Sequence, residues 1–167
     1  LATIAALAGF GLAYLLLTVA GAAVWERQYR AYPARPAWVL PQSIAEDATR
    51  LYRDAYGQPI EYAAGTFPLP YILSFYSPDH PHGLYGSDLA ESPWIDARAL
   101  KSGNKVAVCG TLSFGKPDDP ACPAAATALF GTPDQTRRLV YPVYDPKTRQ
   151  RGLQRYEVLM WKPRESS

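Results

Sequence analysis

Apolar residues fill the start of the chain and then recur in shorter, separated runs. Residues 1–25 contain no charged side chain, and every Lys, Arg, Asp and Glu lies at Glu26 or beyond. A helix rises about 1.5 Å per residue, so this run is long enough to cross the ~30 Å hydrocarbon core of a bilayer. We therefore predict a transmembrane helix over residues 1–25. A truncated signal peptide, cleaved among the small residues from Ala20 to Ala23, is the alternative interpretation.

After this run the pattern becomes mixed. Three prolines, the last of them Pro41, predict an extended linker over residues 26–42. From Ser43 the apolar residues recur at helical spacing, and Glu46 completes a capping box with Ser43. We therefore expect the linker to end where this helix begins, and residues 43–167 to form a soluble domain.

The domain itself alternates helical and strand patterns. Strands are predicted at 60–64 and 105–109, helices at 93–101 and 118–130, and an antiparallel hairpin from 139–144 and 153–161, while residues 69–76 fit either a helix or a strand. This order predicts an α/β (or α+β) fold, in which a small sheet with flanking helices ends in a C-terminal antiparallel hairpin.

Charge and short motifs narrow the function classes. The net charge is +2 and the basic residues are scattered, which is too weak a pattern for nucleic-acid binding. The sequence contains no Walker loop and no GxGxxG, GxSxG or HExxH motif. We therefore predict no nucleic-acid partner, no cofactor, and no catalytic or metal-binding residue within this chain.

Two groups of polar residues could still form a metal-binding or an acid/base site. His80 and His82 could form a two-histidine metal clip with Asp79 or Asp88, but a hydrated turn with two exposed imidazoles explains the same residues without a metal, and we favour it. A second group of carboxylates could supply an acid and a base, although such residues are common as caps at turns and helix starts. This second group consists of Asp88, Glu91 and Asp96.

The two cysteines bear on the compartment. Cys109 and Cys122 bracket a short loop, which predicts a disulfide in an oxidising compartment; two buried free thiols are the alternative. A nucleophilic Cys109 would need a stabilised thiolate, and disulfide formation is the simpler use. The orientation signals disagree, because the basic residues that follow the apolar run favour a cytoplasmic domain.

Aromatic residues are dense between residues 74 and 96. Flat rings beside carboxylates suit sugar binding, although for Tyr76 and Trp94 we favour a place in the core. The set comprises Phe75, Tyr76, Tyr85 and Trp94 with Asp79, Asp88 and Asp96. Because Pro and Gly recur in this segment, we expect an irregular surface that helps to hold the donor or acceptor, with Tyr85 and Asp88 exposed as contact residues and with Trp94 buried as an anchor of the loop.

The same segment carries a family resemblance. Its residues are the turn Tyr56–Pro59, the strand ending at Gly65, the run Ser74–Pro81, Asp88, the run Ser92–Asp96, Gly103 and the strand ending in Cys109. In order and spacing, residues 57–110 resemble the extramembrane C-terminal domain of bacterial family-39-like glycosyltransferases. These are GT-C-type membrane enzymes related to protein O-mannosyltransferases and to the aminoarabinose transferase of lipid A.

The resemblance implies a parent enzyme that transfers a sugar from a polyprenyl-phosphate donor to an envelope glycan or lipid acceptor. It also implies an inner-membrane protein with this domain on the periplasmic side. The catalytic carboxylate of that family lies in an external loop between N-terminal membrane helices, so no residue of this chain inherits a catalytic role. The alternative is a single-pass membrane-anchored binding or assembly module without enzymatic activity.

Overall fold

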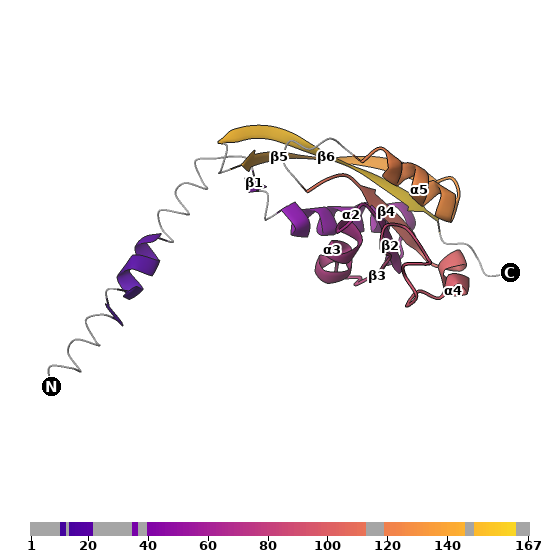
Figure 1. Cartoon of the computed structure of the whole chain (residues 1–167), viewed down its shortest axis with the longest axis horizontal. Coiled ribbons are helices and arrows are strands. Elements are labelled where there is room, and N and C mark those ends of the chain that lie inside the picture. Colours follow the sequence, from indigo (N-terminus) through magenta and orange to yellow (C-terminus); the bar gives the residue numbers. More distant parts are fainter. Residues whose placement is uncertain are drawn as a thin grey trace. The chain divides into compact units, whose positions relative to one another are not determined.

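The computed structural model describes residues 11–12, 14–21, 35–36, 40–112, 119–145 and 149–162 (Figure 1). The chain divides into two compact units, Leu1–Pro33 and Ala34–Ser167. Each unit is described by itself below.

The described part of the first unit is helical. Residues 11–12 and 14–21 form helix, and all of their side chains are exposed, including Leu16 and Leu17. Across the described residues, no helix combines the length and the apolar character needed to cross a membrane. Most of the predicted span over residues 1–25 lies outside the described residues, so the transmembrane helix stays a prediction.

The second unit is built on a mixed sheet that has six strands among the described residues. The strands are β1 (Arg35–Pro36), β2 (Tyr62–Gly65), β3 (His82–Gly83), β4 (Lys105–Cys109), β5 (Gln135–Asp145) and β6 (Gln150–Trp161). Their order across the sheet is β1-β5-β6-β4-β2-β3. Strands β4, β2 and β3 are mutually parallel, while β6 is antiparallel to both β4 and β5. The predicted α/β fold and the C-terminal hairpin are therefore confirmed.

Helices pack on both faces of this sheet. They are α2 (Leu40–Tyr56), α3 (Leu69–Tyr76), α4 (Ala97–Ser102) and α5 (Ala121–Phe130). Apolar residues of α2 and α3 join one buried cluster, and those of α4 and α5 join a second. Figure 1 shows α2 and α3 on the side of the sheet away from α5.

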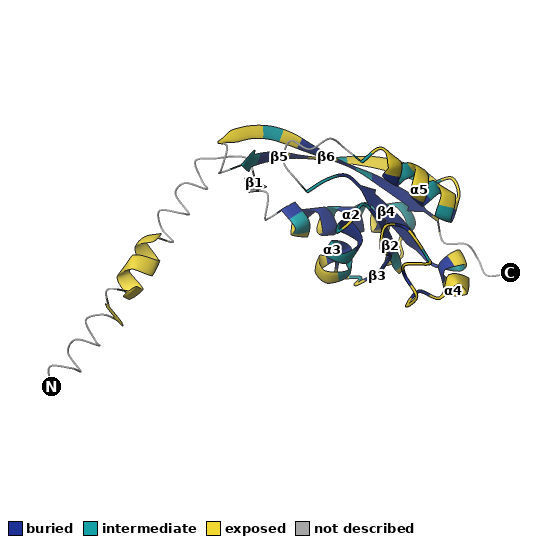
Figure 2. Ribbon diagram, in the orientation of Figure 1, coloured by how far each residue is buried: buried dark blue, intermediate teal, exposed yellow. Residues whose placement is uncertain are grey.

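The central strand β4 separates these two clusters. Val106 and Val108 belong to the cluster with α2 and α3, whereas Ala107 and Cys109 belong to the cluster with α4 and α5. Successive side chains of a strand point to opposite faces, so a strand buried on both faces is mostly apolar; in β4 only Lys105 is charged, and its Nζ donates to Leu100 O and Gly103 O. All five residues of β4 are buried (Figure 2). This explains why the continuous apolar run predicted the strand with its correct bounds.

Three helix predictions need correction. Helix α2 begins at Leu40 rather than Ser43, because Pro41 lies in its first turn, where a missing N–H costs no hydrogen bond. Helix α4 begins after Asp96, not at Pro93: the Asp96 carboxylate accepts a hydrogen bond from Arg98 N (2.7 Å) and acts as the N-cap. Helix α5 begins at Ala121, three residues later than expected. The stretch 69–76, left open by the sequence pattern, is helix α3.

The predicted disulfide is present. Cys109 at the end of β4 is bonded to Cys122 in the first turn of α5, with a Cα–Cα distance of 5.6 Å. Both half-cystines are buried in the cluster beneath α5. The bond therefore fastens the start of α5 to the centre of the sheet, across the segment that joins these two elements.

Candidate functional site

The carboxyl ends of the three parallel strands form the candidate site. In open α/β sheets, ligands commonly bind beyond these ends. Here the residues that follow the strands are Thr66 after β2, Leu84 and Tyr85 after β3, and Gly110 after β4. The predicted contact residues Tyr85 and Asp88 therefore lie at this end of the sheet.

A tight turn presents Tyr85 and Asp88. Gly86 and Ser87 both have positive φ (54° and 59°), and Asp88 N donates to Tyr85 O at 2.8 Å. Tyr85 N donates to Ser92 Oγ (2.9 Å), and Ser92 Oγ donates to Asp88 O (2.7 Å). Ser92 is fully buried, so its hydroxyl fixes both ends of the turn from the protein interior. This rigid turn is the support that a binding loop requires.

The turn exposes its two candidate contact residues. The Tyr85 side chain is 42% exposed, and its ring lies 5.5 Å from that of Phe67, which is also exposed. Asp88 is exposed, and its Oδ1 accepts a hydrogen bond from Ala90 N at 2.8 Å. The expected exposure of Tyr85 and Asp88 is confirmed, while their role in substrate contact stays a prediction. Phe67 was missed because nothing local in the sequence relates residue 67 to residue 85.

Hydrogen bonds connect this turn to the neighbouring strand ends. Gly65 N donates to Ser87 Oγ (3.0 Å), and the next residue, Thr66, donates through Oγ1 to Asp119 Oδ2 (3.2 Å). Gly110 N in turn donates to Thr66 Oγ1 (3.2 Å). One polar chain therefore runs from the Tyr85 turn to the start of α5.

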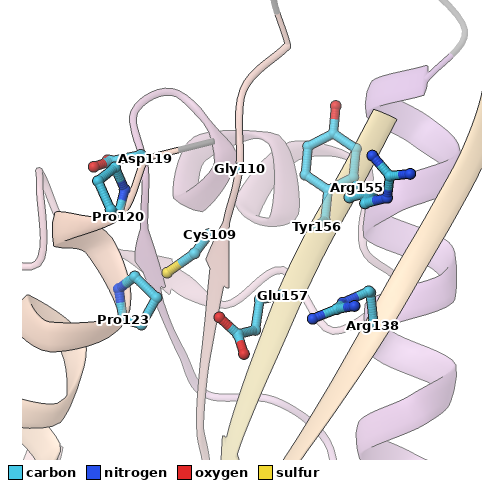
Figure 3. Close-up of a pocket in the computed structure, with 9 residues that line it drawn as sticks. All are labelled: Cys109, Gly110, Asp119, Pro120, Pro123, Arg138, Arg155, Tyr156 and Glu157. Carbon is cyan, nitrogen blue, oxygen red and sulfur yellow. The ribbon is translucent and has the colours of Figure 1, made fainter. Parts of the chain in front are cut away.

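A pocket of about 250 Å³ opens at the end of this polar chain (Figure 3). Its floor is a cross-strand row, in which Cys109 of β4 pairs with Glu157 of β6 and Glu157 pairs with Arg138 of β5. Residues after β4, around the start of α5 and from β6 complete the lining: Gly110, Asp119, Pro120, Pro123, Arg155 and Tyr156. Two guanidinium groups and two carboxylates in one pocket suit a ligand with both hydroxyl and phosphate groups.

The sequence did not identify this pocket. The predicted hairpin strand began at Leu139, which left Arg138 outside it, whereas β5 begins at Gln135. Arg138 and Glu157 meet only through the hairpin register, and Cys109 and Glu157 only through the β4–β6 pairing. The sequence predicted a strand in the region of β6, but it did not show which residues of β4 and β5 this strand pairs with.

The histidine-rich segment does not form the suggested metal clip. His80 Nδ1 is 3.0 Å from Ser74 O, and the His82 ring packs 5.9 Å from that of Tyr62. Tyr62 begins β2, so His82 lies at the amino end of the parallel strands, whereas Asp88 lies beyond their carboxyl ends. Among the described residues, no group of three His, Cys, Asp or Glu side chains could hold a metal ion. Tyr62, the ring neighbour of His82, is partly buried, and this burial raises the pKa of its hydroxyl.

The side chain of Asp79 is buried and connects three segments of the fold. Its side chain is only 1% exposed; it forms an ion pair with Arg53 of α2 and accepts a hydrogen bond from Ile60 N at 2.8 Å. The hydrogen bond and charge of Asp79 raise the pKa of Arg53. Asp79 therefore joins the end of α2, the start of the β2 segment and the loop that follows α3.

The structure also decides the predictions for Trp94, Asp96 and Cys109. Trp94 is not buried as expected: its side chain is 56% exposed, and only its Nε1 is tied down, donating to Gly83 O at 3.0 Å. The indole is large and has a polar atom, so it can anchor a loop by one hydrogen bond while its ring stays at the surface. Asp96 is used as a helix cap, and the disulfide removes Cys109 as a nucleophile.

Replacing Asp79 with alanine should lower the free energy of unfolding by about 1–3 kcal/mol, because the buried Ile60 N–H loses its acceptor. The measurement is urea unfolding of the purified chain, followed by circular dichroism. Asp54→Ala is the matched control, since Asp54 is an exposed carboxylate of α2 and should change stability by less than about 0.5 kcal/mol. Equal midpoints for the two variants would contradict the structural role of Asp79.

Comparisons with protein families, curated proteins and solved structures found no match to this chain. The resemblance to family-39-like glycosyltransferases therefore depends on the sequence motifs between Tyr56 and Cys109 alone.

Proposed function

We propose that this chain is the C-terminal, non-catalytic, periplasmic domain of an inner-membrane glycosyltransferase that transfers a sugar from a polyprenyl-phosphate donor to an envelope glycan or lipid. The observation that carries the proposal is the composition of the site at the carboxyl ends of the parallel strands. There an exposed ring pair, Phe67 and Tyr85, is joined by hydrogen bonds to a pocket with Arg138 and Arg155.

The chemistry of these groups fits a phosphorylated sugar. Aromatic faces cover the C–H groups of a sugar ring, and carboxylates such as Asp88 and Glu157 accept hydrogen bonds from its hydroxyls. Arginine recognises phosphate oxygens with paired N–H donors. The pocket of about 250 Å³ is too small for a whole lipid-linked donor, so we expect it to hold a headgroup only.

Two further observations support the location. The Cys109–Cys122 disulfide is typical of proteins outside the cytoplasm. The described helical residues 11–12 and 14–21 expose apolar side chains such as Leu12, Leu15 and Val19, as expected for a segment surrounded by lipid. The basic residues that follow the apolar run argue for the opposite orientation, but long domains are translocated largely regardless of charge.

The test uses the enzyme that carries this chain, with the double substitution Tyr85→Ala and Asp88→Ala. Loss of a ring contact and of a carboxylate should raise KM for the donor or the acceptor about tenfold and leave kcat nearly unchanged, because the domain binds substrate without doing chemistry. The control is Tyr76→Ala with Asp54→Ala, which removes another exposed tyrosine (43% exposed) and another exposed carboxylate.

Both double variants should unfold at the wild-type midpoint, since surface substitutions usually change stability by less than about 0.5 kcal/mol. An unchanged KM in the Tyr85/Asp88 variant would contradict a substrate-binding role for this turn. A fall in kcat with KM constant would instead show that the turn takes part in the chemical step, contrary to a non-catalytic domain.

A second candidate function is a membrane-anchored binding or assembly module with no enzymatic parent. The observation that favours it is that the described residues contain a pocket and a supported turn, which are sufficient for binding without chemistry. The two functions differ in one measurement: membranes containing the full-length protein should transfer sugar from a polyprenyl-phosphate donor only if the transferase proposal is correct.

A further inference from the structure

A second pocket, of about 290 Å³, lies between α4 and α5, the two helices that Figure 1 shows near the same end of the domain. We call it the α4–α5 pocket. It shares no described lining residue with the pocket at the start of α5. It lies beside Lys105, the first residue of β4, rather than beyond the carboxyl ends of the parallel strands. It is therefore a separate site from the one to which we assign the sugar phosphate.

The lining of the α4–α5 pocket is mainly apolar. The apolar residues among those described are Leu89, Ala97, Leu100, Leu129 and Phe130. Leu100 and Phe130 are buried, while Leu89 and Leu129 are half-buried and pack against the same cluster. Hydrocarbon surface therefore extends from the buried cluster toward solvent. Small-molecule sites typically combine such a lining with a few polar groups, so the pocket suits a ligand with an apolar body.

The remaining lining residues among those described are two lysines. Lys101 is exposed, and its ammonium group has no ion pair or hydrogen bond with another described residue. Lys105 is buried, and its Nζ donates to Leu100 O (3.0 Å), Lys101 O (2.9 Å) and Gly103 O (2.8 Å). No acidic side chain lines the pocket within the part of the chain that the structure describes. The positive charge of the lining favours an anionic group on the ligand.

Helix α4, which forms one wall of the pocket, is held at both ends. At its start the Asp96 carboxylate accepts a hydrogen bond from Arg98 N (2.7 Å). At its end the hydrogen bonds of Lys105 Nζ to Leu100 O and Lys101 O tie the last turn to β4. The two lining residues of this turn are therefore fixed before any ligand arrives. A site supported in this way loses little conformational entropy on binding.

We propose that the α4–α5 pocket binds a small carboxylic acid with an apolar body. At roughly 30 Å³ per non-hydrogen atom, the share of a water molecule in the liquid, the pocket holds about ten such atoms. The apolar body lies against Leu100, Leu129 and Phe130, and the carboxylate accepts hydrogen bonds from the ammonium group of Lys101. One ammonium without a protein partner balances one negative charge, which favours a carboxylate over a doubly charged phosphate. This inference does not depend on the proposed function.

The experiment titrates the full chain, in detergent micelles and with carbon-13 in its leucine methyl groups, with phenylacetate. We expect the methyl resonances of Leu89, Leu100 and Leu129 to shift and to saturate, with a Kd between about 10 μM and 1 mM for a ligand of this size. Leu73 is the internal control, because it lies in the cluster with α2 and α3 and should not shift. Phenylacetamide has the same shape without the charge and should bind about fivefold more weakly.

Two variants of α4 test the charge and the space separately. Lys101→Gln should weaken phenylacetate about fivefold and leave phenylacetamide unchanged, whereas Arg98→Gln removes an exposed charge of the same helix outside the lining and should change neither. Ala97→Leu should fill the pocket and weaken both ligands at least about tenfold. Its matched control is Ala99→Leu, which enlarges another exposed alanine of α4 that does not line this pocket.

Several results would overturn the inference. Shifts that do not saturate, or that affect Leu73 as much as the pocket leucines, would show general partitioning instead of a site. Equal affinity for phenylacetate and phenylacetamide would show that the pocket does not select a carboxylate. Binding that survives Ala97→Leu would place the ligand elsewhere. If circular dichroism shows that Ala97→Leu does not fold, the comparison of the two ligands on the wild-type chain and on Lys101→Gln still decides the question.

Discussion

Replacing Gly65 with alanine is expected to prevent the domain from folding. Gly65 ends β2 with φ at +128°, and a Cβ atom there would lie 2.0 Å from Val108 O in the neighbouring strand β4. That oxygen belongs to the backbone of the central strand, which is buried on both faces and has no room to move. We expect a loss of more than about 4 kcal/mol, which lies in the tail of mutational effects.

The control for this prediction is Gly57→Ala. Gly57 also has positive φ (+66°), but nothing lies within 4 Å of its added Cβ, so only the backbone cost of about 1–2 kcal/mol applies. Circular dichroism of the two purified variants during urea titration compares them directly. A cooperative transition for Gly65→Ala at the midpoint of Gly57→Ala would show that β2 and β4 are not as close as described.

Removing the disulfide should have the second largest effect. The double substitution Cys109→Ala and Cys122→Ala opens a loop with a sequence separation of 13 residues, and we expect the free energy of unfolding to fall by about 3 kcal/mol. The loss arises because the unfolded chain gains conformational freedom when the cross-link is absent. Helix α5 should loosen first, since the bond joins its first turn to β4.

Reduction provides an independent check of the same bond. Dithiothreitol should lower the unfolding midpoint of the wild-type chain to that of the double variant, and it should leave the variant unchanged. A wild-type midpoint that is insensitive to dithiothreitol under denaturing conditions, where the bond is accessible, would mean that the loop closure contributes no stability. A thiol titration that finds two free cysteines would contradict the bond itself.

The sequence pattern correctly predicted those elements whose signals lie within a few neighbouring residues. The buried strand Lys105–Cys109 and the disulfide were correct because a continuous apolar run and a pair of cysteines carry their signals within a few residues. The helix starts were less accurate. A proline such as Pro41 both ends extended linkers and begins helices, and the choice at this position depends on the packing of Leu40 and Ile44 beneath the sheet.

The candidate site depends on pairings that no local pattern contains. Tyr85 and Asp88 were expected at the surface because turn-forming residues surround them, and the structure agrees. Phe67 reaches Tyr85 only because β2 and β3 are neighbours, and Arg138 reaches Glu157 only through the hairpin register. Contacts between residues distant in sequence follow from topology, which single-chain periodicity does not specify.

The short outer strands of the sheet affect whether copies of this protein can pair with one another. Strands β1 and β3 are two residues long, so these outermost strands offer a neighbouring chain very few free N–H and C=O groups. Where β5 extends beyond β1, its edge carries Arg137 and Arg138, and Pro142 lacks an N–H altogether. Copies of the domain at high concentration would therefore resist joining edge to edge into a shared sheet, the first step of aggregation.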